Sequence, residues 1–528
     1  MKSPTLATFL LLLAGLPLLA TSTARAQQQT TAKPAVPIDA SRAAKIAATF
    51  PVLDKLYANL AAKFQAPGLV YGLVVDGQLV HTGAVGYTDV ANRTAATSAS
   101  VFRIASMTKS FVALAVLRLR DDGRLRLDDP AEKYLPELRK APASPTDAPP
   151  FTIRQLLSHS AGFPEDNPWG DRQMGRSDTE LSALVSRGLS FSNPPGLTFE
   201  YSNLGYALLG RIVTRVSGQP VQTYISEKIL RPLGMSSTTW DYQQVPPARL
   251  ARGYAAPTDS GPGADEPLLP KGESFAARGG LLTSVEDFAK YLAFQADAAP
   301  RVAGDVEPNA GPVRRSSVRE MQQSWAFGAL IDNRRRTNGQ ACPISISYGY
   351  GLSVSHDCEG HRFVSHSGGL PGFGSNWLLM PEYGIGVVSF INQTYAAPNY
   401  ANYSALDTLI TLAGLRPRAV PASPILLQRK AELVALLPDF NTLATNPIFA
   451  ENFFLDENLA TRRKAAQALL AQAGSIRRVS ELEPENQLRG RFRLQGALAE
   501  VEVFFTLSPE NPARVQQLDL KLLPPNKP

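Results

Sequence analysis

The first chemistry-bearing pattern in the chain is Ser106-Met107-Thr108-Lys109, a hydroxyl and an amine three residues apart. Residues with this spacing share a helix face, so the amine can reach the hydroxyl. Serine needs a neighbouring base, and lysine becomes one only when its pKa falls. Residues 111–117 are almost all apolar and predict a buried helix that desolvates the amine. The pattern predicts a serine nucleophile at the positive end of a helix dipole; the alternative is an ordinary helix start with Ser106 as N-cap and Lys109 in solvent.

Two later motifs carry groups that could assist this serine. Tyr201 and Asn203 follow a Pro-Pro-Gly turn and begin a predicted helix over 203–218. A phenol beside a lysine can share the role of base, and the amide can hold the substrate or the lysine. His366 begins the run His-Ser-Gly-Gly at the end of a predicted strand. Its glycines let backbone N–H groups approach a substrate closely.

The same short patterns recur elsewhere and are weak evidence alone. Tyr57 and Tyr400 also begin Tyr-x-Asn, and His81 begins a second His-x-Gly. We expect the two tyrosine motifs to be surface or packing residues because neither follows a Pro-Pro-Gly turn. The second His-x-Gly lies upstream, in a predicted hairpin over 69–80 that turns at Asp76-Gly77.

In order and spacing, the three motifs make the chain resemble the serine β-lactamase/penicillin-binding-protein superfamily. The nearest branch is that of class C β-lactamases, D,D-peptidases and related esterases. Flanking stretches at 156–162, 232–235 and 278–284 match as well, and the resemblance covers residues 45–415. It implies an α+β fold, a β-lactamase/transpeptidase-like αβα sandwich with an antiparallel sheet and an inserted helical lobe.

The resemblance also implies a role for each motif residue. Ser106 becomes acylated, while Lys109 and Tyr201 exchange its proton, in an order that the sequence leaves open. The backbone N–H groups of Ser106 and Gly369 form the oxyanion hole. No cofactor or metal is expected. The resemblance assigns substrate binding to Asn203, His366, Ser367 and Gly369.

His366 stands where β-lactamases of this superfamily have a lysine, and histidine is largely uncharged at neutral pH. The sequence therefore predicts a secreted serine hydrolase of D,D-carboxypeptidase or esterase type, acting on D-alanyl peptides or small esters and amides. Binding of anionic substrates is expected to strengthen as His366 gains a proton near pH 6. The alternatives are a true β-lactamase and a catalytically silent binding protein. The acyl donor and the oligomeric state stay open.

Composition along the chain predicts five regions. Residues 1–26 are typical of a signal peptide, and 27–40 of a disordered lead-in. The hydrolase domain is expected over 41–416 and a Pro-rich linker over 417–424. Residues 425–528 are predicted to form a small accessory α+β domain whose partner the sequence leaves unknown.

Charge and cysteine content limit the possible partners and compartments. The formal net charge of +7 falls to +5 without Lys2 and Arg25 of the leader, so no nucleic-acid partner is expected. The apolar part of the leader is too short for a membrane span. We expect an exported protein, periplasmic or extracellular, that acts on a small molecule or peptide. Cys342 and Cys358 are predicted to form a disulfide across a hairpin, with two free buried thiols as the alternative.

Overall fold

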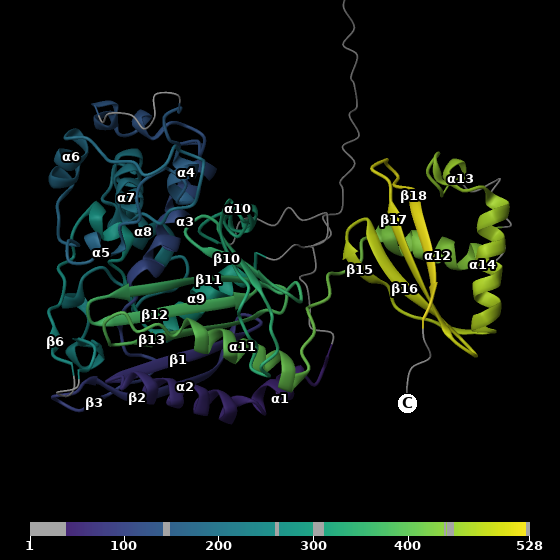
Figure 1. The fold of residues 1–528 in the computed structure, drawn as a ribbon, viewed down its shortest axis with the longest axis horizontal. Helices are drawn as coiled ribbons and strands as arrows, with labels where there is room; N and C mark the ends of the chain where they lie inside the picture. The colour runs from purple at the N-terminus through teal and green to yellow at the C-terminus, as the bar shows by residue number, and fades with distance from the viewer. Residues whose placement is uncertain are drawn as a thin grey trace, which may run out of the picture.

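The structure is a computed structural model that describes residues 39–140, 148–258, 263–298, 311–437, 440 and 448–523. The predicted signal peptide, residues 1–26, lies outside the described residues, as does the predicted lead-in up to residue 38. The two large sheets of the described parts each have their own helices (Figure 1).

The larger sheet has nine antiparallel strands in the described chain, in the order β3-β2-β1-β13-β12-β11-β10-β9-β8. Strand β1 lies between β2 and β13, so segments from both ends of the first unit close the sheet. The strands are β1 (Gly68–Val75), β2 (Gln78–Asp89), β3 (Thr94–Ala95), β8 (Ala326–Ile331), β9 (Ile344–Tyr348), β10 (Ser353–Asp357), β11 (Arg362–Leu370), β12 (Phe373–Met380) and β13 (Ile385–Ile391).

The predicted turn between β1 and β2 is confirmed. Asp76 and Gly77 have φ angles of 47° and 83°, the left-handed conformations that a two-residue hairpin turn requires. All residues of β1, β12 and β13 are buried, because helices cover both faces of the central sheet.

Helices on one face of the sheet are α1 (Arg42–Ala47), α2 (Phe50–Phe64) and α11 (Asn399–Ala413), which share one apolar core with it (Figure 1). The opposite face carries α9 (Val285–Ala296) and the helical lobe. This arrangement is the predicted αβα sandwich. The lobe and its flanks contain α3 (Thr108–Asp121), α4 (Ile153–Leu157), α5 (Asn167–Gly170), α6 (Asp178–Ser186), α7 (Asn203–Ser217), α8 (Val221–Ile225) and α10 (Arg315–Met321). Short ladders join β4 (Phe102–Arg103) to β7 (Leu282–Thr283) and β5 (Gly253–Tyr254) to β6 (Asp265–Glu266).

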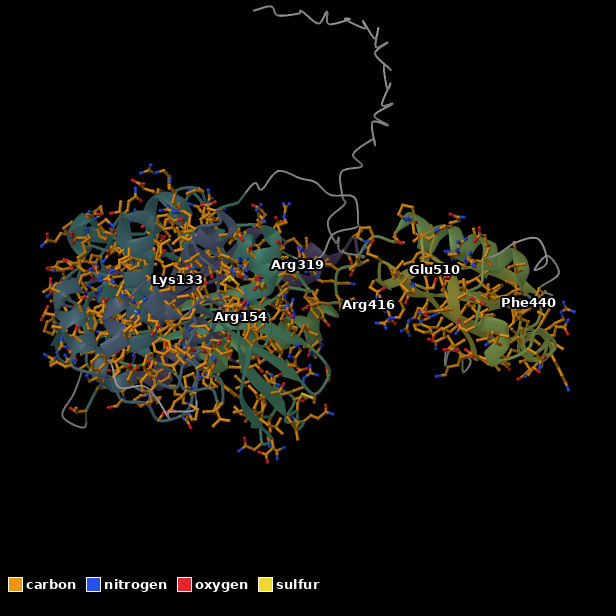
Figure 2. The ribbon with its side chains drawn as sticks, turned by 90° about the horizontal axis from the view of Figure 1, so that it is seen from above. Lys133, Arg154, Arg319, Arg416, Phe440 and Glu510 are labelled. Carbon is orange, nitrogen blue, oxygen red and sulfur yellow. A yellow bond between two sulfur atoms is a disulfide. The ribbon has the colours of Figure 1, made fainter. Side chains whose placement is uncertain are left out.

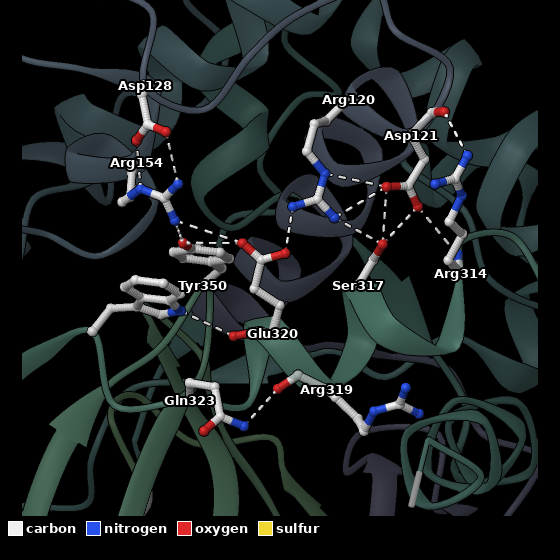
Figure 3. Close-up of polar contacts among 11 residues, drawn as sticks. Arg120, Asp121, Asp128, Arg154, Arg314, Ser317, Arg319, Glu320, Gln323 and Tyr350 are labelled. Atoms are coloured by element: carbon white, nitrogen blue, oxygen red, sulfur yellow. Dashed lines mark hydrogen bonds and ion pairs between the residues drawn. The ribbon is translucent and has the colours of Figure 1, made fainter. Parts of the chain in front are cut away.

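A polar network fixes the C-terminal end of α3 against α10 (Figure 3). Arg120 donates hydrogen bonds to Ser317 and Glu320 of α10. Glu320 also lies 3.5 Å from Arg154 of α4, whose guanidinium is 2.7 Å from Asp128. This network holds the end of α3 remote from Ser106, so the helix that carries Lys109 is anchored at both ends.

The smaller sheet forms a separate unit with its own apolar core. Along one of its strands, Glu500–Leu507, buried and half-buried residues alternate, so that one face of the strand lies on the core. The helices are α12 (Pro424–Leu436), α13 (Phe453–Asp456) and α14 (Leu459–Ala473), and the strands are β14 (Ile476–Val479), β15 (Glu483–Asn486), β16 (Arg489–Gly496), β17 (Glu500–Leu507) and β18 (Val515–Leu522).

Strands β9 and β10 pair as an antiparallel hairpin between the two cysteines. A disulfide joins Cys342, before β9, to Cys358, after β10, with their Cα atoms 5.1 Å apart. The disulfide thus joins the two strands covalently at the open end of the hairpin. Ser353 of β10 and Tyr348 of β9 face each other at the other end.

The two units are joined by a short stretch near Arg416 (Figure 2). Arg418 donates from its backbone to Glu382 and from its guanidinium to Pro381, in the turn between β12 and β13. Pro424 is already the first residue of α12, which Ser423 caps. The connection between the units is therefore 419–422. No helix among the described residues has the length and apolar content needed to cross a bilayer.

Candidate active site

Ser106 lies in a short 3-10 turn, Ala105–Met107, that leads directly into α3. Ala105 before it has a φ of 48°, a left-handed conformation that non-glycine residues rarely adopt and that is typical of functional sites. Gly368 of β11 packs against this turn so closely that a Cβ would lie 2.2 Å from the Ile104 carbonyl oxygen. The glycine of the His-x-Gly motif therefore allows β11 to lie beside the serine.

Lys109 is the second residue of α3 and is fully buried, which confirms the predicted apolar environment. Its Nζ lies 3.0 Å from Ser106 Oγ, 2.7 Å from Asn203 Oδ1 and 2.8 Å from the Arg278 carbonyl oxygen. Burial lowers the pKa of Lys109 well below its usual range, and the Arg278 guanidinium lowers it further. Asp166 and Asp171 act in the opposite direction but do not outweigh the desolvation.

The three contacts of Lys109 identify the direction of its hydrogen bond with the serine. A neutral amine has two N–H donors and one lone pair. The oxygens of Asn203 and Arg278 are carbonyl oxygens and can only accept, so they use both N–H groups. The lone pair then remains for the hydroxyl hydrogen of Ser106. In the neutral state, this geometry makes Lys109 the proton acceptor.

Tyr201 completes the group around the serine. Its ring lies 4.8 Å from Lys109 Nζ, and burial raises its pKa, an effect that a hydrogen bond with Ser106 partly offsets. A raised pKa keeps the phenol protonated, so Tyr201 is not available as the initial base but can relay a proton to another group. Of the two candidate bases, the pKa directions favour Lys109.

Asn203 is held by the start of α7 and by a carboxylate that the sequence analysis missed. Asp166 accepts hydrogen bonds from the backbone N–H groups of Asn203 and Leu204, and from the Ser202 hydroxyl at 3.3 Å. A carboxylate at the beginning of a helix satisfies unpaired N–H groups and interacts favourably with the dipole. Asp166 thereby positions the amide that binds Lys109.

His366 lies within β11, not at its end as predicted, because the strand runs on to Leu370. It is buried, and its Nε2 lies 2.7 Å from the Tyr348 hydroxyl. Burial, followed by the nearby Lys109, lowers its pKa to about 3. The prediction that His366 becomes charged near pH 6 is therefore wrong: desolvation keeps the ring neutral.

A second buried histidine, His159, supports the site from the helical lobe and was not predicted as a site residue. Its Nδ1 accepts a hydrogen bond of 3.1 Å from the backbone N–H of Ser202. Its ring packs against those of Tyr201 and Tyr348, with centroids 4.3 and 4.6 Å away. Burial keeps the pKa of His159 low, so it acts as a neutral packing group that places Tyr201.

Ser106 opens into a cavity of about 500 Å³ between the sheet and the helical lobe. Strand β10 pairs with β11 only as far as Ser365, so the edge of β11 from His366 onward is left uncovered by β10. The cavity is also bounded by Asp171 and Tyr395, which the sequence analysis missed. The predicted site residues that line it are Ser106, Tyr201, His366, Ser367 and Gly369.

The repeated motifs lie elsewhere and serve packing. Tyr57 donates a hydrogen bond of 2.7 Å to Asn402, inside the core between α2 and α11. His81 on β2 contacts Asp54 of α2 at 2.8 Å. Neither group reaches the cavity. Among the described residues, no group of three or more His, Cys, Asp or Glu side chains is placed to hold a metal ion.

Comparison with known protein families gives a match over residues 53–410 to the Beta-lactamase family. The chain belongs to the Beta-lactamase family. This match covers more than half of the chain and contains every residue of the site described above. As a family member, the chain is placed in the serine β-lactamase and penicillin-binding-protein superfamily of serine hydrolases.

Two curated relatives are similar to this chain over more than half of its length. Protein flp of Staphylococcus aureus (strain N315) is 29% identical over 347 residues, 65% of this chain and 63% of that protein. The chain thus spans less than two thirds of that relative's length. Penicillin-binding protein 4* of Bacillus subtilis (strain 168) is 26% identical over 335 residues, 61% of this chain and 67% of that protein.

A solved structure confirms the fold of this Beta-lactamase family member. The octameric penicillin-binding protein homologue from Pyrococcus abyssi aligns with a TM-score of 0.56 and 24% identity. The alignment covers 90% of this chain and 98% of that one. At this identity the likeness supports the β-lactamase/transpeptidase architecture and carries no argument about activity.

Proposed function

We propose that this chain hydrolyses small esters and amides, D-alanyl amides and peptides included, through an acyl-enzyme on Ser106. One observation carries the proposal: the buried Lys109 Nζ lies 3.0 Å from the Ser106 hydroxyl and contacts two carbonyl oxygens, so that in its neutral form the amine directs its lone pair at that hydroxyl. A catalytically silent binding protein would have no need to maintain a buried, uncharged lysine in this geometry.

The reaction follows from the contacts. As Ser106 Oγ attacks the acyl carbon, its proton moves to Lys109 Nζ. As the bond to the leaving group breaks, Tyr201 donates its proton to that group and takes up the proton held by Lys109. The backbone N–H groups of Ser106 and Gly369 receive the negative charge that develops on the acyl oxygen. A water molecule then attacks the acyl carbon and gives a proton to Lys109. That proton returns to Ser106 Oγ as the bond between the acyl carbon and Oγ breaks and the acid leaves.

The charge of the cavity supports neutral esters and amides as substrates. It does not favour β-lactams, which carry a carboxylate, or peptides with a free carboxylate beside the scissile bond. None of the described residues that line it is a lysine or an arginine. Arg278 is buried and directed toward the Gly170 carbonyl oxygen, outside the cavity lining. A substrate carboxylate would lose its hydration without gaining a cationic partner.

We also propose that the protein works outside the cytoplasm, in the periplasm or beyond the cell. The signal-like residues 1–26 and the Cys342–Cys358 disulfide support this location, since disulfides persist in oxidising compartments.

The test is covalent labelling with a fluorophosphonate, followed by mapping of the labelled peptide, together with hydrolysis of p-nitrophenyl butyrate. Ser106→Ala should abolish both signals. Ser345→Ala, the same change on neighbouring β9 outside the cavity lining, is the matched control and should retain both. Undiminished labelling or turnover by Ser106→Ala would refute the proposal.

A further inference from the structure

The cavity beside Ser106 contains one carboxylate, Asp171, and no cationic side chain among its described lining residues. Among those described lining residues, His366 is the side chain that could carry a positive charge, and its burial keeps it neutral. The fixed charge that faces a substrate is therefore negative. A carboxylate in a partly desolvated cavity attracts a cation much more strongly than it would in water.

Asp171 differs from its neighbour Asp166, although both belong to the same loop region of the helical lobe. Asp166 is saturated by the backbone N–H groups at the start of α7. Asp171 accepts one hydrogen bond, from the Tyr395 hydroxyl to Oδ2 at 2.7 Å. Its other oxygen has no hydrogen-bond partner within the described part of the chain. Burial raises the pKa of Asp171, while the Tyr395 hydroxyl and the nearby Lys109 and Arg278 act in the opposite direction. Neither cation forms an ion pair with Asp171 in the described structure.

Tyr395 brings this carboxylate into the reach of a substrate bound at Ser106. It follows β13 with a left-handed φ of 53°, a strained conformation for a residue with a side chain. Its ring lies over Gly369, where an added Cβ would be only 2.9 Å from Tyr395 Cδ1. The phenol therefore spans from the edge of β11, the proposed oxyanion site, to Asp171 on the opposite lobe.

We propose that Asp171, held in place by Tyr395, binds a protonated amine of the substrate, so that the enzyme prefers acyl donors that carry an ammonium group. This inference rests on the proposed function and names its substrate class. A substrate ammonium group can donate a hydrogen bond to the Asp171 oxygen that Tyr395 does not contact. Because both groups are charged, this is a charge-assisted hydrogen bond. Neutral isosteres leave that oxygen unpaired, and anionic isosteres are repelled by it.

The kinetic test compares three p-nitrophenyl esters of matched length: the 6-aminohexanoate, the hexanoate and the monoadipate. We expect wild-type kcat/KM for the aminohexanoate ester to exceed that for the hexanoate ester at least about tenfold, the ratio that 1.4 kcal/mol provides. The adipate should be the poorest substrate. In Asp171→Asn, the aminohexanoate-to-hexanoate ratio should fall to near unity.

Two further variants separate local from general effects. Asp519→Asn removes an exposed carboxylate from β18 of the smaller sheet and should keep the wild-type ratio. Tyr395→Phe removes the hydroxyl that holds Asp171 and should lower the ratio, and it replaces Asp171→Asn if that variant does not fold. A wild-type ratio at or below unity, or an unchanged ratio in the Asp171 variant, would overturn the inference.

Binding to the Ser106→Ala variant tests the subsite without catalysis. By calorimetry, 6-aminohexanamide should bind at least about tenfold more tightly than hexanamide, and adding Asp171→Asn should remove the difference. Equal affinities would reject the ammonium subsite even if esters are hydrolysed. If the amine is preferred in binding but no ester is turned over in a Ser106-dependent way, the proposed function fails and the subsite stands.

Discussion

The Tyr348 hydroxyl donates a hydrogen bond of 2.7 Å to Nε2 of His366. The direction follows from the other ring nitrogen: Nδ1 contacts the carbonyl oxygen of Ser367, which can only accept, so Nδ1 carries the proton. His366 is thus a neutral imidazole with both nitrogens engaged. Protonating Nε2 would reverse its hydrogen bond with Tyr348 and place a charge in a buried site beside Lys109.

The protein should therefore lose stability in mild acid. His159 and His366 both have folded-state pKa values far below 6.5, so the unfolded chain binds more protons than the folded one below that pH. Each histidine then removes about 1.4 kcal/mol of unfolding free energy per pH unit as the pH falls below 6.5. Urea unfolding at pH 7.5, 6.0 and 5.0 measures this slope.

Replacing His366 by Asn should reduce the slope, whereas His356→Asn, an exposed histidine of β10, should leave it unchanged. Equal slopes in the wild type and His366→Asn would show that His366 titrates normally. The same neutrality predicts that turnover of anionic acyl donors does not rise between pH 7.5 and 5.5, contrary to the expectation from the sequence.

Lys109 and Tyr201 should behave as one proton-transfer unit, because both lie against the same serine hydroxyl. Lys109→Ala and Tyr201→Phe should each lower kcat at least about a hundredfold, and the double variant should lose little more than the worse single one. Steady-state kinetics of the wild type and the three variants on p-nitrophenyl butyrate give the double-mutant cycle that measures this coupling. Losses that simply multiply would mean that the residues act independently.

Asp166 should affect catalysis by positioning Asn203, which in turn contacts Lys109. Asp166→Ala removes the acceptor for two backbone N–H groups at the start of α7 and should cost about 1 kcal/mol of unfolding free energy. Because Asn203 then orients Lys109 less well, kcat should fall more than KM rises. Asp166→Asn keeps an acceptor oxygen and should recover most of both losses. If Asp166→Ala lowers stability but leaves kcat intact, the carboxylate is a cap without a role in positioning.

The catalytic residues could be predicted from the sequence because short motifs carry them. Ser106 and Lys109 are three residues apart, and one helix brings them together whatever the rest of the fold does. The burial of Lys109 was also predictable, since the apolar residues that follow it belong to the same helix. The hairpin at Asp76 is a similar case, because its turn chemistry is local.

Asp171 and Tyr395 could not be predicted in this way. They are 224 residues apart and lie in irregular segments, so no periodic pattern marks either one. The charge of His366 was predicted wrongly for a related reason. Its protonation depends on Tyr348, Lys109 and the burial of β11, which only the tertiary structure provides.

The Cys342–Cys358 disulfide should be present in protein isolated from an oxidising compartment. It closes a loop of 16 residues around the β9–β10 hairpin, so removing it should cost at most about 3 kcal/mol of unfolding free energy. Non-reducing peptide mapping identifies the cross-link, and Cys342→Ser/Cys358→Ser measures its contribution. Recovering both cysteines in alkylated form from untreated protein would contradict the prediction.

The smaller sheet should be dispensable for acylation. Its core is built only from residues after 425, and every residue assigned a role here precedes 396. The chain should be ended after Val420 rather than near 416, because Arg418 is bonded to the turn between β12 and β13 that closes the central sheet. Such a chain should react with a fluorophosphonate at Ser106 at a rate within about threefold of the full chain, since independent units contribute additively.

A matched chain ended after Leu415, which loses Arg418, should be labelled similarly but unfold at a lower temperature. Inserting a site-specific protease recognition sequence at 419–422 gives the control for folding, because the full chain folds before it is cut. If the cut protein is labelled normally while the shortened chain is not, the smaller unit assists folding. If neither is labelled, the smaller unit contributes directly to the site, and the assignment of all catalytic groups to the first unit is wrong.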